Sequence, residues 1–209
     1  MAESGEEITV IAHFTAARGH ESELRRLLQD MVGPTRSEKG CLRYELNQEV
    51  ENPGCFTFTE KFVSAAAYEA HLASKHVKRS SEASADLVEE RIVRLHRELL
   101  PAGQEERRMN EADEAHLVVV VHFTAKPGKA DDLSGCLQGL VGPTRAAHGC
   151  IRYELSQDLH DPLTFSFVEV FADQHALDAN CGQPYFHRLF EILPALVDER
   201  YIAVHRRLV

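Results

Sequence analysis

Glu60 lies in a run of alternating aromatic residues that predicts a half-buried β-strand. Phe56, Phe58 and Phe62 share its period of two, so we expect the carboxylate on the same apolar face as the three rings. Burial on such a face disfavours the charged form, raises the pKa of the carboxyl group and suits it to proton transfer. The same side chain could instead anchor the backbone or an arginine such as Arg43, and the sequence leaves both roles open.

A second glutamate, Glu169, stands in the same pattern among Phe165, Phe167 and Phe171. It is therefore a candidate base by the same reasoning. The aromatic residues Phe58 and Phe167, which neighbour the two carboxylates along their strands, are candidate substrate-binding residues.

His13 and His122 each lie in the middle of a β-branched run that predicts the first strand of their half of the chain. A histidine beside a carboxylate makes an acid–base pair that can accept a phenol proton near neutral pH. We therefore expect His13 to share an enclosed cavity with Glu60, and His122 to share one with Glu169. A histidine held in the core by a satisfied hydrogen bond is the alternative.

Four more candidates occupy a predicted helical region. His71 and His76 stand in the first half of the chain, where both could move protons or position a substrate. The equivalent residues of the second half are Asn180 and Tyr185, which can orient a carbonyl or hydroxyl group without titrating near pH 7. A spacing of five does not place two side chains on one face of a helix, so we predict no metal pair. The sequence contains no glycine-rich phosphate loop, and we predict no cofactor.

These residues belong to an internal repeat. The tetrapeptide His-Phe-Thr-Ala begins at 13 and again at 122, and Val-Gly-Pro-Thr-Arg begins at 32 and again at 141. Every matched pair is separated by 109 positions, so the copies align from Ile8 to Leu99 without a gap. The repeat predicts two modules, copy one over residues 1–100 and copy two over residues 116–209. The polar segment 101–115 has no strand pattern and is predicted to be a linker.

Each copy predicts the element order βαββαβ, which is the ferredoxin-like α+β arrangement. Leucines at helical spacing in 24–31 predict the first helix, and Gly33-Pro34 is expected to break or kink it. The region 65–90 predicts a second helix with a break near 74–81. One face of each sheet would stay open, so we predict that the copies cover each other as an intramolecular dimeric α+β barrel. Whether whole chains pair further through an exposed strand edge stays open.

Composition narrows the partners. Asp and Glu number 33 against 23 Lys and Arg, and the resulting net charge of -10 argues against nucleic acid or an anionic membrane surface. No apolar run approaches the roughly 20 residues of a membrane helix, and the acidic N-terminus does not have the pattern of a secretion signal. Five cysteines without close spacing predict reduced thiols. We therefore expect a cytoplasmic protein whose partner is a small molecule.

The repeated string Gly-Cys-x-Arg-Tyr-Glu-Leu, followed by Phe-x-Phe-x-Glu-x-Phe, resembles the antibiotic-biosynthesis monooxygenase family. In copy one it continues to Ala-His-Leu-Ala-Ser-x-His, which ends at His76. The resemblance implies a dimeric α+β barrel that oxidises phenolic or quinol-like substrates with O₂, without metal or flavin, in a pocket between sheet and helices.

Three functions follow as alternatives. The first is a cofactor-independent monooxygenase acting on a phenolic, anthrone or quinol-type molecule, with the carboxylates or strand histidines as bases. The second is a non-catalytic or stress-responsive α+β barrel that binds a small apolar ligand. The third is an isomerase of a small carbonyl compound. Haem-degrading relatives use a tryptophan, and this chain has none.

Overall fold

The computed structural model describes residues 5–100 and 116–209, and these form two compact units. The first unit contains the chain up to Arg97 together with Arg207–Val209, and the second runs from Glu98 to Arg206. Each unit has the predicted ferredoxin-like order, with the second helix in two pieces. Among the described residues, no helix combines the length and apolar character needed to cross a membrane.

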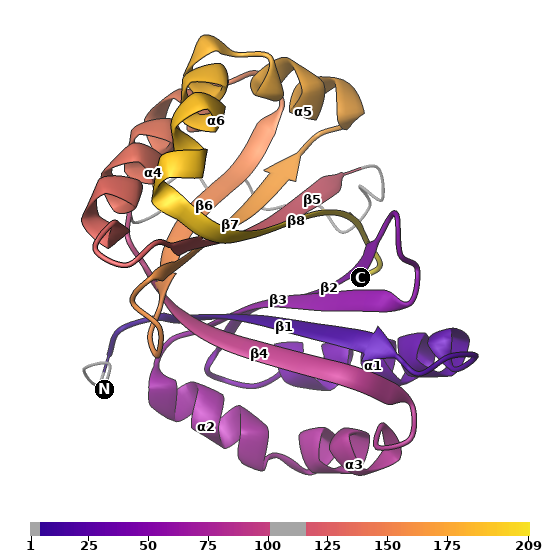
Figure 1. The fold of residues 1–209 in the computed structure, drawn as a ribbon. Helices are drawn as coiled ribbons and strands as arrows, with labels where there is room; N and C mark the ends of the chain where they lie inside the picture. The colour runs from indigo at the N-terminus through magenta and orange to yellow at the C-terminus, as the bar shows by residue number, and fades with distance from the viewer. Residues whose placement is uncertain (1–4, 101–115) are drawn as a thin grey trace. The chain divides into compact units, whose positions relative to one another are not determined.

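The first unit is a four-stranded antiparallel sheet in the order β4-β1-β3-β2, with its helices on one face (Figure 1). Helix α1 packs beside α3, and α2 lies against β3. The elements are β1 (Ile8–Ala16), α1 (Glu21–Arg36), β2 (Cys41–Glu49), β3 (Cys55–Phe62), α2 (Ala65–Ala73), α3 (Lys75–Ala83) and β4 (Val88–Glu98).

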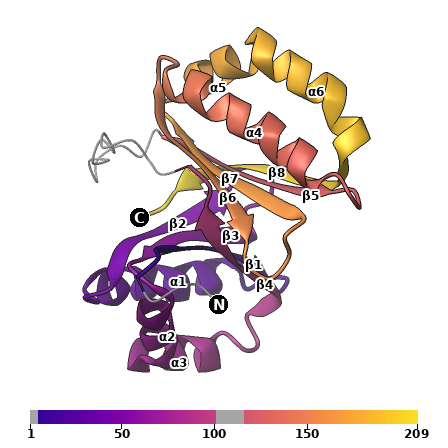
Figure 2. The ribbon, with the colours of Figure 1, turned by 90° about the vertical axis from the view of Figure 1, so that its left-hand side faces the viewer.

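The second unit repeats this arrangement in the order β8-β5-β7-β6, and Figure 2 shows α4 and α6 side by side over its sheet. Each of its seven elements starts 109 positions after its counterpart, as the gapless repeat predicts. They are β5 (Leu117–Ala125), α4 (Ala130–Arg145), β6 (Cys150–Asp158), β7 (Thr164–Phe171), α5 (Gln174–Cys181), α6 (Pro184–Leu196) and β8 (Val197–Arg207).

Strand register decides which side chains meet under the helices. In β1 and β3, Val10 pairs with Glu60 and Ala12 pairs with Phe58, and these even-numbered residues face the helices. Odd-numbered residues such as His13 and Thr57 point to the opposite face, because successive strand residues alternate. The helix-facing positions hold the core of the unit, which includes Leu24, Leu28, Phe56 and Phe62.

The expected break of the first helix at Gly33-Pro34 does not occur, and a kink there stays a prediction. Helix α1 continues through Gly33 and Pro34 to Arg36, because a proline so near the C-terminal end removes few helical bonds. In copy two the second helix is also divided, with Gly182 after α5 and Pro184 in the first turn of α6, where its missing N–H costs nothing.

The break in copy one, which was predicted near 74–81, lies at Ser74. Ser74 has an extended backbone, ends α2 and caps α3, because its side chain accepts a hydrogen bond from the Val77 amide. The chain therefore changes direction between His71 and His76, and these residues lie on two different helices.

Each unit includes a short segment from the end of the other copy of the repeat. Arg207–Val209 extend the first unit's sheet, where the Leu208 amide donates to the Leu46 carbonyl at 2.8 Å. In the second unit, the Leu99 amide donates to the Leu155 carbonyl at 2.9 Å. The predicted modules 1–100 and 116–209 and their mutual packing stay predictions, and the predicted linker 101–115 lies outside the described residues.

Candidate functional site

Glu60 lies in the middle of β3 under the helices of copy one, between Val10 of β1 and Tyr44 of β2. The residue is 4% exposed, and its Oε2 forms no hydrogen bond with any described residue. Burial raises the pKa of the Glu60 carboxyl to about 8, against the opposing charge of Arg91. A carboxyl with this pKa can accept and return a proton near neutral pH.

Glu60 lines a cavity of about 30 Å³ beneath α2 and α3. This volume has room for about one or two water molecules, and its wall is mostly apolar. Burial raises the pKa of the Tyr68 hydroxyl to about 12 and that of Tyr44 well above its ordinary value, so both phenols stay protonated. The lining residues are Ala12, Phe14, Met31, Tyr44, Phe58, Glu60, Tyr68, His71, Leu72, Val77, Arg91 and Val93.

His71 is the helix-borne histidine that reaches this cavity. Its ring packs 5.5 Å from Tyr44 and 5.1 Å from Phe62, measured between ring centroids, and the residue is 3% exposed. Burial lowers the pKa of His71, although the nearby Glu38 carboxylate opposes the shift. His71 is thus a largely neutral imidazole in the cavity wall.

Glu38 connects the two predicted histidines. His71 Nδ1 donates to Glu38 Oε2 at 3.0 Å, and His76 Nε2 lies 3.4 Å from Glu38 Oε1. His76 Nε2 also shares a 3.0 Å hydrogen bond with Thr35 Oγ1. Sequence reasoning did not find Glu38, but a comparison of the copies offers a signal, because its counterpart is Ala147.

The expected pairing of His13 with Glu60 was wrong. His13 pairs in register with Thr57, one face away from Glu60, and its Nδ1 shares a 3.0 Å hydrogen bond with Thr57 Oγ1. Val10 is the register partner of Glu60, and His13 stands three positions after Val10. Because side chains alternate along a strand, an odd offset places His13 on the opposite face of the sheet from Val10 and Glu60.

Copy two contradicts the pairing in the same way. His122 pairs in register with Ser166, and its Nδ1 shares a 2.7 Å hydrogen bond with the Ser166 hydroxyl. Its ring also stacks on Tyr201 at 5.5 Å between centroids. Glu169 faces the helices instead, where burial raises its pKa to about 8 and a hydrogen bond from Tyr153 partly opposes the rise.

Asn180 and Tyr185 occupy the places of the copy-one histidines and bind each other. The Tyr185 hydroxyl donates to Asn180 Oδ1 at 2.8 Å. Asn180 is 2% exposed, and its Nδ2 has no hydrogen-bond partner among the described residues. The Asn180 Nδ2 group therefore stays available to donate to a ligand.

The helix-facing residues of copy two differ in size from those that line the copy-one cavity. Val121 replaces Ala12 and Phe186 replaces Val77, and both replacements belong to the buried cluster of copy two. Phe167, the predicted substrate contact, packs there against Tyr153 at 4.8 Å between centroids. Two other positions of the cavity wall carry smaller residues in copy two, where Leu177 replaces Tyr68 and Cys181 replaces Leu72.

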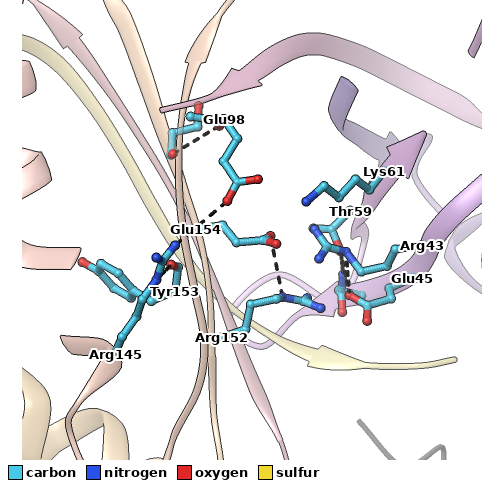
Figure 3. Close-up of polar contacts among 12 residues, drawn as sticks. Arg43, Glu45, Thr59, Lys61, Glu98, Arg145, Arg152, Tyr153 and Glu154 are labelled. Carbon is cyan, nitrogen blue, oxygen red and sulfur yellow. Dashed lines mark hydrogen bonds and ion pairs between the residues drawn. The ribbon is translucent and has the colours of Figure 1, made fainter. Parts of the chain in front are cut away.

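The strand register also excludes the alternative role for Glu60, an ion pair with Arg43. Arg43 lies on the face away from the helices, next to Glu45, which accepts a hydrogen bond from the Thr59 hydroxyl at 3.1 Å (Figure 3). Figure 3 also shows the corresponding Arg152–Glu154 pair of copy two, 3.8 Å apart. The two faces of each sheet thus separate paired charges from the buried glutamates.

The fold and this sheet-and-helix site define a tandem ferredoxin-like protein with a carboxylate under the helices of each module. The antibiotic biosynthesis monooxygenase family model matches residues 7–83 and 116–191, and the chain belongs to that family. All five cysteines are free, as predicted.

Individual relatives agree with this membership. The chain is 32% identical over 99 residues to "Uncharacterized protein sll1783" of Synechocystis, which covers 47% of this chain and 67% of that protein. It is 36% identical over 69 residues to "Putative monooxygenase Rv0793" of Mycobacterium tuberculosis, which covers 33% of this chain and 67% of that protein. A Fusobacterium nucleatum structure, described as "Putative monooxygenase", has the same fold with a TM-score of 0.82 and 13% identity, over 98% of this chain and 94% of its own.

Proposed function

We propose that the protein is a cofactor-independent monooxygenase that oxidises a phenolic, anthrone or quinol-type molecule with O₂ in the cavity of copy one. The observation that carries this proposal is Glu60, a buried carboxyl with a pKa of about 8 and an unpartnered oxygen beside an aromatic-lined cavity. Family membership supports the reaction class.

The reaction needs a base and a dry site. Glu60 accepts a proton from an acidic C–H or O–H group, and the resulting carbanion or phenolate is electron-rich. For a methylene substrate, the carbanion carbon forms a bond to O₂, and proton return gives a hydroperoxide. A base then removes the second C–H proton, the electron pair of that bond forms the carbonyl as the O–O bond breaks, and the departing hydroxide takes up a proton and leaves as water. Both electron pairs come from the substrate.

Copy one has the groups that such a substrate requires. Phe58 and Tyr68 supply flat apolar surface, and His71 supplies an imidazole that can bind or relay the released proton. His13 and His122 lie on the opposite sheet faces and have no role in this scheme. Glu169 shares the chemistry of Glu60, but Phe186 and Val121 fill the space beside it in copy two.

Substrate entry requires a change in the outer wall of the cavity, because about 30 Å³ is too small for an aromatic ring. Leu72 on α2 is 39% exposed, and Val77 on α3 is half-buried, so both side chains can move toward solvent. The break at Ser74 lies between them and allows the two helices to separate.

Oxygen consumption tests the proposal. The full chain is mixed with hydroquinones and anthrones in the presence of EDTA, and an oxygen electrode and product chromatography follow the reaction. We expect one O₂ consumed for each molecule of oxygenated product. Conversion of a carbonyl compound without O₂ uptake would identify an isomerase, and binding without conversion would identify a ligand-binding protein.

A further inference from the structure

Three side chains of copy one meet where α1, α2 and α3 converge. The carboxylate of Glu38 lies just beyond the end of α1, and the imidazoles of His71 and His76 come from α2 and α3. One ligand atom from each lies within 4.8 Å of the other two. We propose that these residues form a binding site for one first-row divalent metal ion, with Zn²⁺ as the probe.

Two of the distances, each to a different oxygen of Glu38, are close to those around such an ion. Zn²⁺ binds nitrogen and oxygen ligands at about 2.0–2.2 Å, which places neighbouring tetrahedral ligands roughly 3.4 Å apart. His71 Nδ1 lies 3.0 Å from Glu38 Oε2, and His76 Nε2 lies 3.4 Å from Glu38 Oε1. An ion would take the place of the proton that now bridges His71 and Glu38.

The donor set selects the class of metal. Two imidazoles and one carboxylate favour zinc and its first-row neighbours over Mg²⁺ and Ca²⁺, which prefer oxygen ligands. Glu38 Oε1 is buried and forms no hydrogen bond within the described residues, so it has an unfilled place for a cation. Glu38 and His76 remain partly exposed, which leaves a fourth ligand position for water.

Copy two is a natural control because it has replaced all three ligands. Ala147, Asn180 and Tyr185 stand at the positions of Glu38, His71 and His76. The surrounding Thr144 and Tyr153 are unchanged from copy one. Replacement of the three ligands within a retained framework indicates that they act as one unit.

The proposed ion would be bound next to the cavity, not inside it. His71 lines the cavity, whereas Glu38 and His76 do not. The ion would therefore hold α2 and α3 together across the break at Ser74 and fix the His71 ring in the cavity wall. The proposed oxygenation needs no metal, and an ion bound here would oppose the separation of α2 and α3 through which substrate enters.

Calorimetric titration of the metal-free full chain with ZnCl₂ tests the site, with Cys181 replaced by Ala in every sample because its thiol is exposed. We expect one Zn²⁺ per chain and a higher melting temperature with the ion. Replacement of a residue that only hydrogen-bonds to a metal ligand typically weakens metal binding by roughly 10–100-fold. Loss of a ligand itself should weaken Zn²⁺ binding by more than this. Glu38→Gln, which keeps the shape of the side chain, and His76→Ala should both show this loss.

The matched control is Tyr185→Phe in copy two, which should bind Zn²⁺ as the parent does. Circular dichroism of each variant shows whether it has folded. If His76→Ala does not fold, Glu38→Gln alone provides the test of ligand loss. Absence of binding in the parent, or equal affinity in the parent and the folded ligand variants, would overturn the metal site. Neither result depends on oxygen uptake, so the proposed monooxygenase function is judged separately.

Discussion

The two copies share their backbone elements and differ beneath their helices. In copy one, α3 is short and carries Ser80, and a cavity lies next to Glu60. In copy two, Leu189 stands at the position of Ser80, α6 runs for 13 residues, and its apolar side chains join a filled core. The two modules therefore keep the same strands and the same buried glutamate, while the side chains beside that glutamate differ.

The buried glutamates are the part of the site that the two copies have in common. Glu60 and Glu169 have the same place, the same burial and the same direction of pKa shift. The groups around them differ, because His71 and Glu38 in copy one correspond to Asn180 and Ala147 in copy two. A raised pKa is thus insufficient to identify the working copy, and the neighbouring cavity is the better guide.

Removal of the cavity histidine should have an effect as large as that of replacing Glu60. His71→Ala should lower oxygen uptake by about 10²–10⁴-fold, the usual cost of losing a proton-transfer group. Asn180→Ala and Tyr185→Phe should leave the rate unchanged. Unchanged uptake in His71→Ala, with a large loss in either copy-two variant, would assign the activity to copy two.

Filling the copy-one cavity should have a smaller effect on the rate at saturating substrate and a clear effect on binding. Val77→Phe introduces the copy-two residue into the cavity wall and should raise the KM for an aromatic substrate. Overpacking typically costs about 1–3 kcal/mol of stability, so thermal unfolding of the variant provides the control. A folded Val77→Phe protein with the parent KM would show that the substrate binds elsewhere.

The buried glutamates should make stability depend on pH. Their folded pKa of about 8 lies above the ordinary value of 4.5, so the folded state binds more protons between these values. Stability should therefore fall as pH rises from about 5 to 8, by up to about 1.36 kcal/mol per pH unit for each group. Glu60→Gln should flatten this dependence in chemical unfolding between pH 5 and 8. An unchanged slope would mean that Glu60 is ionised throughout.

His13→Ala should have the smallest effect on catalysis, because His13 lies on the opposite face of the sheet from Glu60. We expect the parent rate in oxygen uptake and a modest loss of thermal stability, since the hydrogen bond to Thr57 is removed. A rate loss comparable to that of His71→Ala would restore His13 to the site.

The repeat and the aromatic alternation were sufficient to predict the fold and the place of Glu60. Both depend on periodicities that a strand imposes on its own residues. The faces of His13 and Glu60 could not be related in this way, because the register between two strands is set by packing and turns outside either strand. Glu38 was missed because it lies in the turn after α1 and meets His71 and His76 from two other helices, which spacing along one helix does not describe.

The central claim is that Glu60 in copy one is the working base, and paired substitution of the two glutamates tests it most directly. Oxygen uptake with one active quinol or anthrone is measured for Glu60→Gln and for Glu169→Gln, each checked for folding by circular dichroism. The account predicts a loss of about 10²–10⁴-fold in Glu60→Gln and the parent rate in Glu169→Gln. Parent activity in a folded Glu60→Gln protein would contradict it.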